Sequence, residues 1–402
     1  MKYLIIGASA AGLAAAETLQ KINKNCQITI LCREKKPYSR VLLPYLLAGD
    51  VVEQEIFLQV PEGVELIGKK EVIQIDPKKK EVFTTSGEAF SFDKLLIATG
   101  AYAVKPELDG INLPFVFTVR NLSDIKRIQE IVIKRNRAVI AGGGLISMRV
   151  GEALHRLGIK ITFVIKSNHV LSRILDKPAS VIVEQVLAEH DIEIIKEDEI
   201  IKIVKGKAYL DSGRSINCSL IVFGKGVHPN VHFLKGSGVE VNRGIVVNQY
   251  QQTNLEDIYA AGDVAETLDI TYGEKRINAL WPVAREQGHI AALNMASIHT
   301  ICEGSVARNT LETFGLPIFT AGMGHDEGLE VVREQGRSFY HKLVLNNGVL
   351  KGTIFVGKVI NEGFYLFLMR KKLDVSKFVY PLLKNKFKYP NLVYSYLHIS
   401  HL

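Results

Sequence analysis

A short run of small residues near the amino terminus could bind phosphate groups. It follows an apolar segment at residues 2–6 and precedes a segment, 11–22, whose apolar residues recur with helical spacing. Its first glycine allows a tight bend, its small side chains let backbone N–H groups approach a pyrophosphate, and its last glycine lets helix and strand pack closely. The residues concerned are Gly7, Ser9, Ala10, Ala11 and Gly12, with Ser9 in place of the usual middle glycine. This pattern predicts a dinucleotide site at a helix N-terminus.

A second turn of the same kind lies about 135 residues further along the chain. It stands between a strand-like segment at 138–141 and a helical pattern at 145–157. Its candidate cofactor-binding residues are Gly142, Gly144, Leu145 and Ile146, and Ser147 replaces the last glycine. Because the whole strand–turn–helix–strand pattern occurs twice, the sequence predicts two Rossmann-like domains built on parallel sheets.

The two copies differ where a carboxylate is expected to bind the ribose hydroxyls. Glu34 lies 22 residues after Gly12, at the end of the second predicted strand, and fits this role. The second copy has Ile165 and Lys166 at the equivalent place. Lys166 could pair with a 2′-phosphate, so NADH and NADPH both fit the second site.

Composition narrows the class of protein. The chain has 402 residues, enough for two or three domains, and its apolar runs are far shorter than the ~20 residues of a membrane span. Four scattered cysteines without a Cys-x-x-Cys pair favour neither a metal site nor a redox disulfide. Because the first strand begins directly after Met1-Lys2, we expect a cytoplasmic protein. The net charge of +8 fits either a solvated lysine-rich surface or a docking face for an acidic electron carrier.

Two further segments give the chain a family resemblance. Residues 94–101 contain Thr99 and Gly100, and residues 257–265 contain the string Tyr-Ala-Ala-Gly-Asp. With the two turns, they resemble the two-dinucleotide flavoprotein superfamily that includes glutathione reductase-like enzymes. The resemblance implies FAD at the first turn, with Asp263 accepting a hydrogen bond from its ribityl chain. Further cofactor-binding residues expected from it are Thr99, Gly100, Gly226 and Gly262.

The same resemblance implies a domain order. An α/β fold is expected in which the FAD domain, residues 1–108 and 229–305, is interrupted by an NAD(P)-binding domain at 109–228. Residues 306–402 are expected to form an α+β interface-type domain. In that domain, Asn346-Asn347-Gly348 between two apolar runs predicts a hairpin. The aromatic and aliphatic stretch from Tyr380 to Tyr394 would either fold onto this domain or dock onto a partner.

Within the superfamily, the chain is most similar to the NADH:rubredoxin reductase and nitrite reductase flavin-domain branch. The similarity lies in residues 37–49, 281–288 and 311–317. Relatives with a thiol mechanism place a cysteine in or near the first of these stretches. Here the stretch has none, so a thiol mechanism is not expected.

Two departures from the family pattern occur together. Tyr45 stands where relatives usually have a lysine beside the flavin, and Arg149 stands where they have the glutamate that pairs with it. The two residues either form a substitute wall for the nicotinamide or mark a site reshaped for another donor, and Arg149 could also be a solvated helix residue. Arg40 would stabilise the reduced flavin if it reaches the ring, and would otherwise be a salt-bridged surface arginine.

These features predict an FAD-dependent NAD(P)H oxidoreductase that moves electrons between a nicotinamide cofactor and a carrier protein. The expected partner is rubredoxin, ferredoxin or an iron–sulfur subunit, and the chain is expected to be a monomer or part of a hetero-complex. An FAD subunit that relays electrons or scaffolds an assembly without turning over NAD(P)H is the alternative. An oxygen-reducing NADH oxidase is a third hypothesis, disfavoured by the missing cysteine.

Overall fold

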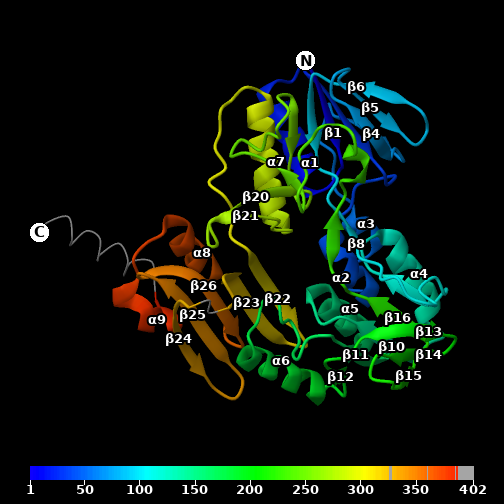
Figure 1. Cartoon of the computed structure of the whole chain (residues 1–402), viewed down its shortest axis with the longest axis vertical. Coiled ribbons are helices and arrows are strands. Elements are labelled where there is room, and N and C mark those ends of the chain that lie inside the picture. The colour runs from blue at the N-terminus through cyan, green and yellow to red at the C-terminus, as the bar shows by residue number, and fades with distance from the viewer. Residues whose placement is uncertain (326–327, 360, 385, 388–402) are drawn as a thin grey trace, which may run out of the picture. The chain divides into compact units, whose positions relative to one another are not determined.

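The computed structural model describes residues 1–325, 328–359, 361–384, 386 and 387 (Figure 1). Their contacts separate into two compact units. Unit 1 contains Met1–Pro106, Phe117–Ile133 and Lys225–Ser305. Unit 2 contains Glu107–Val116, Lys134–Gly224 and the described residues from Val306 on. Of the aromatic and aliphatic stretch at 380–394, residues 385 and 388–394 lie outside the described residues.

A five-stranded parallel sheet with the order β19-β7-β1-β2-β3 forms the centre of unit 1. Its strands are β1 (Lys2–Ile6), β2 (Gln27–Cys32), β3 (Glu65–Gly68), β7 (Lys94–Ile97) and β19 (Ile258–Ala260). The helices α1 (Ala10–Ile22) and α7 (Trp281–Met295) pack on one face, over the buried Ile5 and Ile30 (Figure 1). A Cβ atom on Gly288 of α7 would lie 2.1 Å from the backbone oxygen of Ala11, so these helices meet through their backbones.

The opposite face of this sheet is covered by a smaller antiparallel sheet and by loops, which bury Val82 and Phe92 against it. The smaller sheet consists of β4 (Val72–Asp76), β5 (Glu81–Thr84) and β6 (Ala89–Ser91). The other helices of unit 1 are η1 (Arg40–Leu42), α2 (Leu43–Ala48), α3 (Glu53–Ile56), α4 (Leu122–Val132) and η2 (His232–Leu234). Its remaining strands are β8 (Ala101–Ala103), β17 (Val227–Pro229), β18 (Ile245–Val246), β20 (Ala265–Asp269) and β21 (Glu274–Arg276).

A second sheet has the order β12-β11-β10-β16-β9; its first four strands lie in unit 2, and β9 begins there. Its strands are β9 (Val116–Thr118), β10 (Arg137–Ala141), β11 (Lys160–Val164), β12 (Glu193–Ile195) and β16 (Leu220–Phe223). The pairs of β10 with β11 and β16, and of β11 with β12, are parallel. The helices are α5 (Leu145–Arg156) and α6 (Lys177–Glu189), and an antiparallel sheet is formed by β13 (Ile200–Val204), β14 (Lys207–Leu210) and β15 (Ser215–Asn217).

The rest of unit 2 is an antiparallel sheet with the order β22-β23-β26-β25-β24. Its strands are β22 (Arg308–Thr313), β23 (Leu316–Gly322), β24 (Glu330–Gln335), β25 (Tyr340–Asn346) and β26 (Val349–Val356), and its helices are α8 (Glu362–Lys371), η3 (Ser376–Phe378) and α9 (Val379–Leu383). Phe319, Phe355 and Tyr365 lie buried between the sheet and α8. The predicted hairpin is confirmed as β25–β26, with positive φ angles at Asn347 (48°) and Gly348 (76°).

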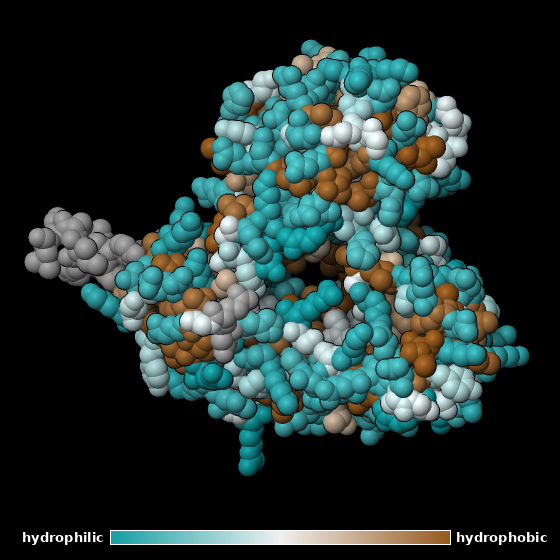
Figure 2. Space-filling view, in the orientation of Figure 1, coloured by the Kyte–Doolittle hydropathy of each residue, from teal (hydrophilic) through white to brown (hydrophobic). Residues whose placement is uncertain are grey.

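The predicted fold class is therefore confirmed, with two parallel sheets and a C-terminal α+β region. The predicted domain boundaries stay a prediction, and residues 117–133 pack with unit 1 although they lie inside the expected 109–228 domain. Among the described residues, no helix is long and apolar enough to span a membrane. Hydrophilic residues cover most of the face in Figure 2, between smaller apolar patches.

Candidate functional site

The first glycine turn joins β1 to α1 through contacts that admit no side chain. Gly7 has a φ of +112°, and a Cβ atom on it would lie 2.2 Å from the backbone oxygen of Ala98. A Cβ atom on Gly12 would lie 1.9 Å from the backbone oxygen of Gly7. Ser9 precedes α1 and makes no capping hydrogen bond with its side chain, and the first turn of α1 has no acidic residue. The helix N-terminus therefore keeps the N–H donors and positive end of the dipole that a diphosphate requires.

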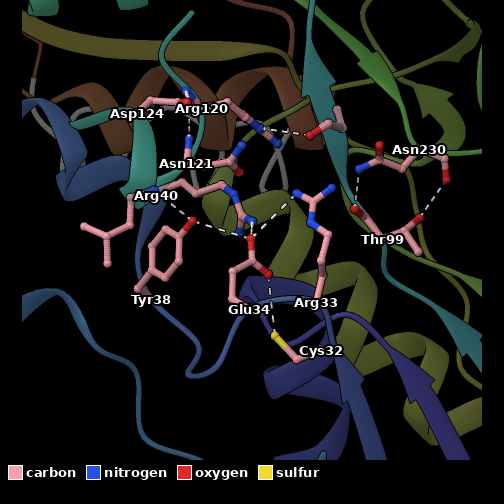
Figure 3. Close-up of polar contacts among 12 residues, drawn as sticks. Cys32, Arg33, Glu34, Tyr38, Arg40, Thr99, Arg120, Asn121, Asp124 and Asn230 are labelled. Atoms are coloured by element: carbon pink, nitrogen blue, oxygen red, sulfur yellow. Dashed lines mark hydrogen bonds and ion pairs between the residues drawn. The ribbon is translucent and has the colours of Figure 1, made fainter. Parts of the chain in front are cut away.

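Several residues of unit 1 meet at the carboxyl edge of its parallel sheet. β1, β7 and β19 run in the same direction, so Gly7, Thr99 and Gly262, which follow them, lie at one edge. Thr99 Oγ1 donates to the backbone oxygen of Asn230 at 2.9 Å, and Asn230 Nδ2 donates to that of Thr99 at 2.8 Å (Figure 3). The N–H of Gly262 donates to Gln287 Oε1 at 2.8 Å. Crevices at this edge are the usual ligand sites of open α/β sheets.

Glu34 lies two residues past β2, at the centre of a polar cluster (Figure 3). Arg40 Nη2 is 2.5 Å from Glu34 Oε1, and the Tyr38 hydroxyl donates to the same oxygen at 3.4 Å. Arg33 Nη2 lies 3.8 Å from it, and the thiol of Cys32 lies 3.6 Å from Oε2. The structure thus places Arg40 against the carboxylate expected to bind ribose, and its expected contact with the flavin ring stays a prediction.

Three of the four cysteines are poor nucleophiles. Burial, helped by the neighbouring Glu34 carboxylate, raises the pKa of Cys32 to about 11. Burial likewise raises the pKa of Cys218, in unit 2, to about 11, and that of Cys26 in the same direction. None of the four cysteines forms a disulfide in the structure. Because the thiolate is the reactive form, these thiols are unsuited to the chemistry of a disulfide reductase near neutral pH.

Asp263 is paired with an arginine that the sequence analysis did not identify. Arg120 Nη2 lies 2.9 Å from Asp263 Oδ2, and Arg120 Nε donates to the backbone oxygen of Ala101 at 3.0 Å. Asp124 fixes the backbone, because its Oδ2 accepts hydrogen bonds from the N–H groups of Arg120 (3.0 Å) and Asn121 (2.9 Å). The only local signal is an arginine just before a helix start with an acidic residue in its first turn. Arg120 adds a positive charge at the edge where a diphosphate is expected.

The second glycine turn, before α5, resembles the first, but its last position is Ser147 instead of a glycine. Gly142 has a φ of +125°, and a Cβ atom on it would lie 2.4 Å from the backbone oxygen of Gly224. Gly144 precedes α5, whose first turn also lacks an acidic residue. Ser147 is buried, and its hydroxyl has no hydrogen-bond partner among the described residues. The backbone around these residues fits a dinucleotide phosphate as the first turn does.

The remaining predicted residues of unit 2 lie around this turn. Leu145 and Ile146 begin α5, with Ile146 exposed. Lys166 follows β11 and forms an ion pair with Glu199, in which Nζ and Oε2 are 3.1 Å apart.

Gly226, also predicted to bind a cofactor, lies in unit 1. It has a φ of +93°, and its backbone oxygen accepts a hydrogen bond from the N–H of Val104 at 2.9 Å.

Tyr45 and Arg149 lie in different units. Tyr45 is partly buried on α2. Arg149 Nη1 donates to the backbone oxygen of Glu312 at 2.5 Å and lies 3.2 Å from Glu152 Oε2. Glu152 Oε1 in turn accepts from the N–H of Phe314 at 3.2 Å. Arg149 thus links α5 to the end of β22, and its expected role beside the nicotinamide stays a prediction. No cluster of three His, Cys, Asp or Glu residues able to hold a metal ion exists within the described ranges.

Comparisons with known proteins agree with this geometry. The chain is 28% identical to the NADH-dependent phenylglyoxylate dehydrogenase subunit epsilon of Aromatoleum evansii, covering 93% of each chain. It is also 28% identical to the NADH-rubredoxin oxidoreductase of Clostridium acetobutylicum, covering 94% of this chain and 95% of the relative. Two other curated relatives are about twice as long, since the chain covers only 48% and 50% of them.

Solved structures share the fold. An NAD-dependent persulfide reductase from A. fulgidus superposes with a TM-score of 0.87 at 23% identity, covering 94% of this chain and 78% of that one. The family model for pyridine nucleotide-disulphide oxidoreductases matches residues 1–288. The predictions of an oxidoreductase and of FAD with NADH or NADPH as cofactors are confirmed by this match. The chain therefore belongs to the pyridine nucleotide-disulphide oxidoreductase family.

Proposed function

We propose that this protein passes electrons from NADH or NADPH, through FAD, to a one-electron carrier protein or an iron–sulfur subunit. The observation that carries the proposal is the combination of two glycine turns that each open a helix, the lack of a cysteine in residues 37–49, and burial that raises the pKa of Cys32 and Cys218. Bound FAD supplies the exchange between hydride transfer and single-electron transfer. A family member without a reactive thiol has no internal disulfide to reduce, so electrons must leave for an external acceptor.

In this proposal the residues of unit 1 bind and orient the flavin. The N-terminus of α1 and the Arg120 guanidinium would hold the diphosphate, because both place positive charge at the carboxyl edge of the sheet. Glu34, held by Arg40 and Tyr38, would accept hydrogen bonds from the ribose hydroxyls. Asp263, held by Arg120, would accept one from the ribityl chain.

Relatives support a protein acceptor. Those with nearly the same length include one named for rubredoxin and one named as a dehydrogenase subunit. The expected partners are therefore rubredoxin, ferredoxin or an iron–sulfur subunit of a larger oxidoreductase, with the chain in the cytoplasm as a monomer or in a hetero-complex. The net charge of +8 would speed encounter with an acidic carrier.

Anoxic titration of the purified protein tests the proposal directly. NADH or NADPH should bleach the visible absorbance of the flavin at one equivalent. The reduced protein should then reduce added rubredoxin or ferredoxin within seconds, and the rate should fall as salt is added. A flavin that neither nucleotide bleaches would contradict the proposal.

A second candidate is a flavin subunit that relays electrons without turning over NAD(P)H. The bonds of Arg149 favour it, because they fasten the helix of the second turn to the C-terminal sheet at a position where relatives have a glutamate. A flavin that ignores both nucleotides but is reduced by a co-purifying redox subunit would support this candidate.

A further inference from the structure

The carboxyl end of β11 carries a charge pair assembled from two separate segments. Lys166 follows the strand, and Glu199 comes from the loop between β12 and β13. Lys166 Nζ and Glu199 Oε2 are 3.1 Å apart. In a dinucleotide-binding βαβ unit, the end of the second strand is where the adenosine ribose is recognised. The pair therefore stands where NADH and NADPH differ.

Backbone hydrogen bonds hold the two segments side by side. The N–H of Ile165 donates to the oxygen of Ile195 at 2.9 Å, and that of Asp198 donates back to Ile165 at 3.1 Å. The segment that carries Lys166 is also tied to the glycine turn, because the N–H of Leu171 donates to the oxygen of Gly143 at 2.8 Å. Turn, lysine and carboxylate thus belong to one connected edge of the sheet.

Asp198 fixes the loop that presents Glu199. Its side chain is 2% exposed, and its Oδ1 accepts the N–H of Glu199 at 2.9 Å. Its Oδ2 accepts from the Ser212 hydroxyl at 2.6 Å and lies 3.3 Å from Arg214 Nη2. The backbone of Glu199 is therefore held in place, and its carboxylate reaches Lys166 without a rearrangement of the loop.

Two neighbouring cations are also matched with carboxylates. Lys196 Nζ lies 2.5 Å from Glu184 Oε2, and Arg214 pairs with Asp198. A 2′-phosphate arriving at Lys166 would thus have to displace Glu199 or lie beside it, and two anions at that distance repel. A 2′-hydroxyl has the opposite relation to Glu199, because it can donate a hydrogen bond to the carboxylate.

We infer that Glu199 makes this site select NADH over NADPH, by occupying Lys166 and repelling the 2′-phosphate. The inference rests on the proposed use of nicotinamide nucleotides at this turn. Glu199 thereby supplies, from a neighbouring loop, the carboxylate that the chain lacks at the end of β11.

The test is calorimetric binding of NAD⁺ and NADP⁺ to the flavin-loaded protein and to Glu199→Gln. The wild-type protein should bind NAD⁺ more tightly. The variant should bind NADP⁺ about 10-fold more tightly than the wild type, with a change of less than about threefold for NAD⁺. Adding Lys166→Gln to the variant should abolish the gain, and added salt should reduce it.

Glu197→Gln is the matched control, because it removes one negative charge from an exposed residue of the same loop. It should leave the ratio of the two dissociation constants unchanged. An unaltered ratio in Glu199→Gln would overturn the inference and assign discrimination to other groups, such as Arg173 on the loop after β11. Failure of the wild-type protein to bind either nucleotide would instead overturn the proposed function, and this inference with it.

Discussion

At the end of β2 the chain itself supplies a carboxylate, Glu34, and the cation Arg40 comes from the segment that follows. At the end of β11 the chain supplies a cation, Lys166, and the carboxylate Glu199 comes from a neighbouring loop. The side chains of the first pair are each 24% exposed, whereas those of the second are 79% and 36% exposed. The charge at the end of each strand is therefore set by the assembled sheet edge, and the residue at the motif position does not decide it alone.

The two glycine turns also differ in which residue leaves room for the close approach of strand and helix. In the first, a Cβ atom at Gly12 would meet backbone, at 1.9 Å from the oxygen of Gly7. In the second, the equivalent residue is Ser147, and room for it comes from Gly224, where a Cβ atom would lie 2.1 Å from the Ser147 hydroxyl oxygen. The close approach of strand and helix is kept in both copies, but the glycine that allows it lies in the helix in the first copy and just after β16 in the second.

Alanine at the equivalent position of each turn should have very different effects. Gly12→Ala forces a methyl group into the backbone of the turn, so its cost should lie at the upper end of the about 1–3 kcal/mol that overpacking brings, and we expect flavin affinity to fall by about 100-fold. Ser147→Ala removes a buried hydroxyl without a described partner, and should change stability by less than about 1 kcal/mol. Flavin content after purification and the thermal midpoint measure both effects. Comparable flavin loss in the two variants would contradict the comparison.

The elements around the turns could be predicted because each carries its own local signal. The segments predicted at 2–6 and 145–157 are observed as β1 (Lys2–Ile6) and α5 (Leu145–Arg156). Hydrophobic periodicity and a glycine bend act over a few residues, so they are readable in a single chain. The packing of 117–133 with unit 1 could not be predicted in this way, because it depends on contacts between distant segments.

The same limit explains which site residues were missed. Arg120 and Asp263 are separated by 143 positions in the sequence, and Lys166 and Glu199 by 33. Neither pair has a spacing that repeats or a motif that marks it, since only the tertiary fold brings the residues together. Conversely, Glu34 was predictable because its distance from the glycine turn is fixed by one helix and one strand.

Glu34 and Glu199, the carboxylates at the two strand ends, should contribute differently to nucleotide affinity. Glu34→Gln leaves the partly buried Arg40 without its ion-pair partner and weakens the expected ribose contact. Hydrogen bonds to charged groups contribute about 1.5–3 kcal/mol, so the dissociation constant for FAD should rise about 10- to 100-fold. Reconstitution of the flavin-free protein, followed by flavin fluorescence, measures this. Glu17→Gln, on the exposed surface of α1, is the control and should leave FAD binding unchanged.

If the FAD affinity of Glu34→Gln stayed within about threefold of the wild type, Glu34 would have no role in ribose recognition. The corresponding pair in unit 2 is more exposed, and exposed ion pairs contribute about 0–1 kcal/mol. The affinity of Glu199→Gln for NAD⁺ should therefore change much less than the affinity of Glu34→Gln for FAD.

The fit between Ser147 and Gly224 in the second turn can be tested with single and double alanine variants. Gly224→Ala requires the Ser147 hydroxyl to turn away, which we expect to cost about 1 kcal/mol and to lower the thermal midpoint by about 2–4 °C. The double variant Gly224→Ala with Ser147→Ala should recover most of this loss, because the conflicting oxygen is gone. Additive effects of the two substitutions would show that Ser147 and Gly224 are not coupled.

The smallest effect is expected at the buried thiols, which are alike in the two units. Cys32→Ala and Cys218→Ala should each leave NAD(P)H-dependent flavin reduction within about twofold, because a thiol with a pKa of about 11 is protonated at neutral pH. In the wild-type protein, each thiol stabilises the fold below its ordinary pKa of 9.0, and this contribution is lost as the pH rises from 9.0 towards 11. The difference in thermal midpoint between each variant and the wild type should therefore be constant below pH 9.0 and shift in favour of the variant above it. A loss of flavin reduction in Cys32→Ala alone would reveal a thiol role in unit 1 that its burial beside Glu34 argues against.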